Sequence, residues 1–82
     1  MENSLLVVTL ATFEEAVEFC DLLTPLLQQH CNTAAIHAKS SKNARGGFDV
    51  RVSGFDEKRT AKVTLICDAF ELGFTRDWSR RI

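Results

Sequence analysis

Cysteine and histidine side chains are the groups of this chain that could act as nucleophiles or bind a metal ion. The 82 residues include Cys20, Cys31, Cys67, His30 and His37. Structural zinc sites usually begin from a short pair such as C-x2-4-C or H-x3-5-H, and the sequence has no such pair. The neighbours His30 and Cys31 point in different directions on a helix or strand, which is a poor geometry for activating a thiolate. We therefore expect no metal, no cofactor, no catalytic residue and no enzymatic activity.

The same cysteines bear on the compartment. An odd number of cysteines without a CxxC pair fits free thiols in a reducing environment better than a disulfide framework. The apolar run at residues 5–10 is too short for a membrane span or for the core of a signal peptide with its cleavage site. We expect a cytoplasmic protein without membrane contact.

Three carboxylates could form a docking surface. Glu14, Glu18 and Asp21 follow one another at helical spacing, so they share one side of a helix. One interpretation is a solvated face, because the helix dipole favours acidic residues near the N-terminus. The other is a surface that docks a basic partner.

Basic residues form a first group in the middle of the chain. Lys39, Lys42 and Arg45 lie in or beside a polar segment. Arg51 follows on the next predicted strand and projects from the same sheet face as His37 and Lys39 if the two strands pair. Such side chains contact phosphate groups in nucleic acids. The predicted strand face has no aromatic residue on which bases could stack. A loop that is basic for solubility alone is the competing interpretation.

A second basic group surrounds the single tryptophan near the C-terminus. Arg76, Arg80 and Arg81 flank Trp78. Tryptophan and arginine dominate the binding energy of many protein interfaces, so this group is a candidate partner-binding site. Alternatively, Trp78 covers the core.

The elements that position these residues begin with a strand and a helix. Residues 5–10 form an apolar, β-branched run typical of a strand buried on both faces. Thr12 and Glu15 have the spacing of a capping box, so a helix should begin there. Pro25 should kink this helix or restart it with Thr24 as a second N-cap, and helical structure should reach about Gln29.

Two half-buried strands are predicted next. Residues 33–39 and 48–53 alternate apolar and polar side chains. The polar residues 40–46 between them, which lead into Gly47, predict a hairpin with a long, mobile and basic loop.

The last third fits two patterns. In the first, a helix begins at an Asp56 N-cap, buries an apolar stripe widened by Leu65 and Leu72, and stops at Gly73. In the second, residues 61–67 form a strand and a helix begins at Asp68. Strand alternation breaks at Ile66, which favours the helix.

The predicted fold class is α+β, with residues 1–82 forming a single domain. A chain of this length can build one modest core. The expected architecture is a two-layer sandwich with an antiparallel sheet of three to four strands and two helices on one face. Its order is β-α-β-β-α, with β-α-β-β-β-α as the alternative.

A coarse resemblance to a known family rests on the second half of the chain. Gly54 is followed by the charged residues 57–59 and by a predicted helix that ends near Asp77 and Trp78. With the size and element order, this is similar to the DinI-like proteins, small intracellular regulators that bind a protein partner. The arginines at the end of this chain differ from the acidic C-terminal helix of those proteins, so we do not assign the chain to that family.

Charge is divided unevenly along the chain, although the net charge is only -1. All ten Lys and Arg side chains follow residue 38, whereas residues 1–30 contain Asp and Glu but no Lys or Arg. The first hypothesis is a non-enzymatic adaptor or inhibitor that docks a protein, including a second copy of itself, through charged surfaces and an uncovered sheet with apolar positions. The alternative is a module that binds RNA or DNA phosphates through the basic hairpin and the C-terminal arginines.

Overall fold

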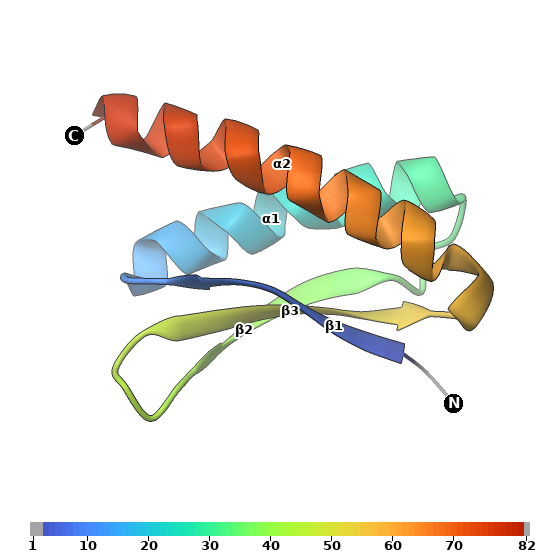
Figure 1. Ribbon diagram of the computed structural model, residues 1–82, viewed down its shortest axis with the longest axis horizontal. Coiled ribbons are helices and arrows are strands. Elements are labelled where there is room, and N and C mark those ends of the chain that lie inside the picture. The colour runs from blue at the N-terminus through green and yellow to red at the C-terminus, as the bar shows by residue number, and fades with distance from the viewer. Residues whose placement is uncertain (1–2, 82) are drawn as a thin grey trace.

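A three-stranded sheet and two helices form two layers in the computed structural model, which describes the backbone of residues 3–81 and the side chains of residues 3–76. The elements are β1 (Asn3–Leu10), α1 (Phe13–Cys31), β2 (His37–Lys42), β3 (Phe48–Phe55), a 3-10 turn (Glu57–Arg59) and α2 (Thr60–Arg81). Both helices cover the same face of the sheet (Figure 1). The predicted α+β sandwich with the order β-α-β-β-α is confirmed, and the alternative with a fourth strand is wrong.

The central strand of the sheet is β3. The strand order is β1-β3-β2, and β3 is antiparallel to both neighbours. The last strand in sequence therefore lies between the first two, which leaves β1 and β2 as edge strands. α1 and α2 run in roughly opposite directions above the sheet, so the start of α1 and the end of α2 lie at the same end of the molecule (Figure 1).

The core lies between the sheet and the helices. Val50 and Val52 of β3 are fully buried under the helical layer. The ring of Phe19 from α1 packs edge-on against Phe70 and Phe74 of α2, with ring centroids 4.9 and 5.0 Å apart. Edge-to-face pairs of this kind add to the stabilisation from burial alone. These contacts hold the helices over one face of the sheet.

Helix α1 is continuous through its proline. Thr12 caps it as predicted, because its hydroxyl accepts a hydrogen bond from the Glu15 amide at 3.2 Å. The predicted restart at Pro25 with Thr24 as a second N-cap is wrong, because α1 is one helix and the Thr24 hydroxyl accepts a bond from the Ala38 amide of β2 at 3.0 Å. The alternative of a kink at Pro25 stays a prediction. Pro25 is exposed, so water can satisfy the carbonyl that loses its helical donor.

The strands differ from the prediction in their limits and burial. β1 is not buried on both faces, since the helices cover only one face and Leu6 is 47% exposed. β2 begins at His37 and continues to Lys42, so three residues expected in the loop belong to the strand. The hairpin connection is only residues 43–47. The backbone amide of Asn43 closes this connection by donating a hydrogen bond to the Gly47 carbonyl at 2.9 Å.

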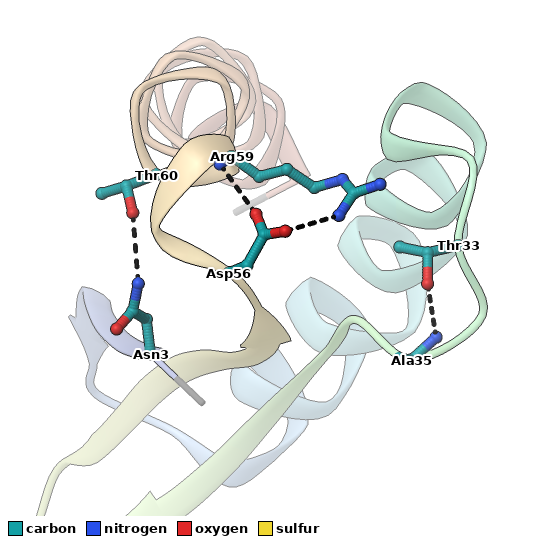
Figure 2. A network of polar contacts seen from close by, with 6 residues as sticks. All are labelled: Asn3, Thr33, Ala35, Asp56, Arg59 and Thr60. Carbon is teal, nitrogen blue, oxygen red and sulfur yellow. Dashed lines mark hydrogen bonds and ion pairs between the residues drawn. The ribbon is translucent and has the colours of Figure 1, made fainter. Parts of the chain in front are cut away.

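The last third of the chain is helical, as favoured. Asp56 caps the 3-10 turn before α2, accepting a bond from the Arg59 amide at 3.1 Å and pairing with the guanidinium at 3.2 Å (Figure 2). The Asn3 amide group reaches the Thr60 hydroxyl at 3.4 Å, which ties β1 to the start of α2. Gly73 was expected to end the helix, but α2 continues to Arg81.

Candidate functional site

The face of the sheet opposite the helices is the candidate functional site, and we call it the outer face. Val50 and Val52 point toward the helices, so the alternating residues of β3 point the other way. The strand registers arrange the outer face in three rows. Across β2, β3 and β1 these rows are His37–Ser53–Ser4, Lys39–Arg51–Leu6 and Ser41–Asp49–Thr9.

The middle row carries two positive charges side by side. Lys39 is the register partner of Arg51, and both side chains are exposed. Neither forms an ion pair with any residue whose side chain the structure describes. Like charges directly opposite each other on a sheet are unfavourable. An anion placed between them would relieve that repulsion.

The next row joins a histidine to a serine. The Nδ1 atom of His37 lies 3.1 Å from the Ala35 carbonyl oxygen, which can only accept, so Nδ1 carries the hydrogen. In the neutral ring, Nε2 therefore accepts a hydrogen bond from the Ser53 hydroxyl at 3.3 Å. Both side chains are half-buried. Sequence reasoning placed His37 on this face but missed Ser53, which only the strand register brings beside it.

The third row places a carboxylate at the other end of the outer face. Oδ1 of Asp49 accepts hydrogen bonds from the Asn43 side-chain amide at 3.0 Å and the Thr9 hydroxyl at 2.8 Å. These bonds lower the pKa of Asp49, and the positive charge of Arg51 lowers it further. Asp49 therefore remains negatively charged at neutral pH, two positions along β3 from the cationic row.

The other two predicted nucleic-acid contacts lie apart from this row. Lys42 is the register partner of Phe48, whose ring packs on the core, so Lys42 projects on the helical side of the sheet. Arg45 is exposed in the hairpin connection and borders a shallow hollow beside Thr9 and Leu10. The structure thus brings Lys39 and Arg51 together and separates Lys42 and Arg45 from them.

The acidic residues occupy the opposite layer. Glu14 and Asp21 are exposed on α1, whereas Glu18 is half-buried. Arg76 is exposed in the C-terminal part of α2. Trp78, Arg80 and Arg81 belong to α2, but their side chains lie outside the described residues.

The three cysteines are free and buried. Burial raises the pKa of Cys67 to about 11 and also raises the pKa of Cys20. Both thiols are protonated at neutral pH, and a protonated thiol is a poor nucleophile. Within the described part of the chain, no cluster of His, Cys, Asp or Glu has the make-up of a metal site, and no helix has the length and hydropathy to cross a membrane.

Exposed leucines form a second surface on the helical layer. Leu65 and Leu72 lie two turns apart on α2, and each is 71% exposed. The helical periodicity placed them beside the buried stripe, but α2 turns its Val63, Cys67 and Phe74 side toward the core instead. Leu22 of α1 is 50% exposed as well. Sequence reasoning therefore missed this apolar surface.

Comparisons with known proteins give no assignment. No protein-family model matches the chain, and neither a curated protein nor a solved structure does.

Proposed function

We propose that the protein binds the phosphate backbone of nucleic acid through the outer face of its sheet. The observation that carries this proposal is the register pair of Lys39 and Arg51, two exposed cations side by side with no ion-pair partner among the described side chains. From the sequence alone a protein partner ranks slightly ahead, because the net charge of -1 is not basic. The outer face is mainly polar and carries this cationic pair, which favours an anionic ligand.

The separation of charge between the two layers supports this orientation. Helix α1 contains four acidic residues and no Lys or Arg, whereas the segment from β2 to β3 contains four basic residues and one acidic residue. A polyanion is repelled by the first and attracted by the second. Long-range electrostatics would therefore steer it toward the sheet.

The outer face has no aromatic side chain among its described residues. Phe48 and Phe55 of β3 pack on the helical side, where Phe55 belongs to the core. Stacking of bases on the sheet, as in RNA-binding sheets, is therefore not available there. Contacts made by Lys39 and Arg51 are contacts to phosphate, which position a nucleic acid without reading its sequence.

Binding should weaken as the salt concentration rises. With one phosphate neutralised by Lys39 and Arg51, the logarithm of the association constant should fall against the logarithm of salt concentration with a slope of about -0.7 for a single strand and about -0.9 for a duplex. Fluorescence anisotropy with labelled oligonucleotides of two unrelated sequences measures both the slope and the sequence preference. Absence of binding at low salt, or binding that salt does not weaken, would contradict the proposal.

A protein partner is a second candidate, favoured by the exposed leucines of α2. Leu65 and Leu72 offer an apolar centre, and the acidic residues Glu14 and Asp21 of α1 offer a polar border in the same layer. Interfaces combine such an apolar centre with a polar rim. In this case the protein acts as an adaptor or inhibitor and not on nucleic acid.

This second candidate predicts a nuclease-resistant complex that depends on the helical layer. Changing Leu65→Ser together with Leu72→Ser should reduce partner capture at least about tenfold, because apolar contacts near an interface centre dominate its energy. The matched control is Leu6→Ser, which removes an exposed leucine from the sheet layer. Capture is measured from nuclease-treated lysate with each variant immobilised. Equal capture by both variants, or capture lost with nuclease, counts against a protein partner.

A further inference from the structure

The rows of the outer face have the spacing of a nucleic-acid strand. Residues on the same face of a β-strand are about 6.7 Å apart along the strand, which resembles the separation of successive phosphates in an extended single strand. Opposite residues of neighbouring strands are closer, with Cα atoms about 4.5–5.5 Å apart. Side chains of one row can therefore meet at one phosphate, and the next row can meet the following phosphate.

The middle row fits one phosphate best. Lys39 and Arg51 are opposite each other, exposed and without an ion-pair partner among the described side chains. The guanidinium offers paired N–H donors and the ammonium offers a second positive charge. Together they can hold the two non-bridging oxygens of one phosphodiester group.

The row toward the start of β2 offers a second phosphate-binding position, or seat, which is neutral and therefore weaker. The hydrogen of the Ser53 hydroxyl points to Nε2 of His37, and the ring is held in place by its bond to the Ala35 carbonyl. This hydroxyl hydrogen can rotate toward a phosphate oxygen, and water can replace it at the half-exposed ring. The ring thus positions Ser53 without having to touch the ligand.

The row in the opposite direction repels phosphate. Asp49 is held by the Asn43 side chain and Thr9, and the bonds that hold it also favour its charged form. A phosphate on this row would lie beside the Asp49 carboxylate, and Arg51 is the only described cation that acts on that carboxylate. The site is therefore closed at one end.

From these three rows we infer that the outer face seats two successive phosphates of single-stranded nucleic acid, the first between Lys39 and Arg51 and the second at Ser53, with Asp49 closing the site. The inference rests on the proposed function. A single strand has free backbone torsions and can turn away from Asp49. A duplex is stiff and carries phosphates past both ends of the cationic row, so one of them meets this carboxylate.

The test is the change Asp49→Asn. Oδ1 of Asp49 accepts both hydrogen bonds, and the amide oxygen of asparagine can accept the same two, so the hairpin should keep its structure. Asp49 lies one row, about 6.7 Å along the strand, from a phosphate held by Lys39 and Arg51. At low salt two charges at that distance interact weakly in water, so affinity for a labelled oligothymidylate should rise about two- to fivefold. Affinity for a duplex of equal length should rise by a larger factor, from a weaker starting value.

The matched control is Asp68→Asn, which removes the same charge from the exposed side of α2. It should leave both affinities unchanged, and anisotropy at low salt measures all variants with both oligonucleotides. The inference is overturned if Asp49→Asn has no effect, if Asp68→Asn has the same effect, or if the wild-type protein prefers the duplex. Each of these results leaves the proposed function standing, whereas the proposed function itself fails if no nucleic acid binds.

Discussion

Replacing both cations of the outer face, Lys39→Glu with Arg51→Glu, is expected to remove detectable nucleic-acid binding at moderate salt. Lys39 and Arg51 are opposite each other on neighbouring strands, and in the proposed site both would contact one phosphate, so the double change would replace attraction by repulsion at the same point. Each lost phosphate contact lowers the salt dependence by about one unit of slope. At low salt we expect a loss of at least about tenfold, measured by anisotropy.

The chain offers a matched control for this double change. Lys42→Glu with Lys62→Glu alters the net charge equally, but Lys42 projects on the helical side of the sheet and Lys62 is exposed on α2. This control should weaken binding much less, through the overall field alone. If both double variants lose affinity equally, binding depends on net charge, and the outer face is not the site.

The single change Lys39→Glu separates binding from folding. It places a carboxylate directly opposite Arg51, where an opposite-charge pair stabilises a sheet by about 0.2–1 kcal/mol. The variant should therefore unfold at a slightly higher urea concentration while it binds nucleic acid more weakly. If stability rises while binding weakens, the loss of binding does not come from a loss of structure. It also indicates what the natural residue contributes: a charge that is unfavourable in the free protein and favourable against an anion.

Strand alternation alone identified much of the outer face. Residues 48–53 alternate so clearly that Arg51 must oppose the buried valines, and the same argument placed His37 and Lys39 together. The end of β2 was not predictable in this way. Ser40, Ser41 and Lys42 are polar on both sides of the strand, and Lys42 is exposed although it lies on the helical side. Such a segment has the composition of a loop until its register with β3 is known.

Ser53 and Asp49 show a second limit of the sequence. Their partners are 16 and 40 residues away in the chain, so no local pattern joins the Ser53 hydroxyl to His37 or Asp49 to Thr9. These contacts exist because β3 inserts between β1 and β2, and that order is a property of the whole sheet. Periodicity gives the face on which a side chain lies, whereas topology gives its neighbours.

The exposed side of α2 could not be predicted from periodicity for a different reason. Leu65 and Leu72 widened the apparent apolar stripe, and it is the packing of Phe70 and Phe74 against Phe19 that turns the other side of α2 toward the core. The continuation past Gly73 has a similar cause, because tertiary contacts of Phe74 hold the helix where local propensity would allow it to end.

The second large effect is expected from Gly54→Ala, which should destabilise the fold by about 2–5 kcal/mol. Gly54 has a φ of 85°, which is unfavourable for any residue with a Cβ atom. A Cβ atom built there would also overlap the carbonyl oxygen of Ala35 and lie 2.8 Å from its carbonyl carbon. That carbonyl holds the His37 ring, which lies beside Ser53, so any backbone shift that relieves the overlap also displaces the proposed second phosphate seat.

Two other glycines separate the causes of this effect. Gly46 has a φ of 88° but no atom near its would-be Cβ, so Gly46→Ala should cost only the conformational strain, about 1–2 kcal/mol. Gly73 lies within α2 in open space, so Gly73→Ala should stabilise the protein by about 0.5–1 kcal/mol. Urea denaturation of the three variants gives the free energies of unfolding. If Gly54→Ala costs no more than Gly46→Ala, the close approach of β3 to Ala35 is not what requires glycine, and the second seat does not depend on it.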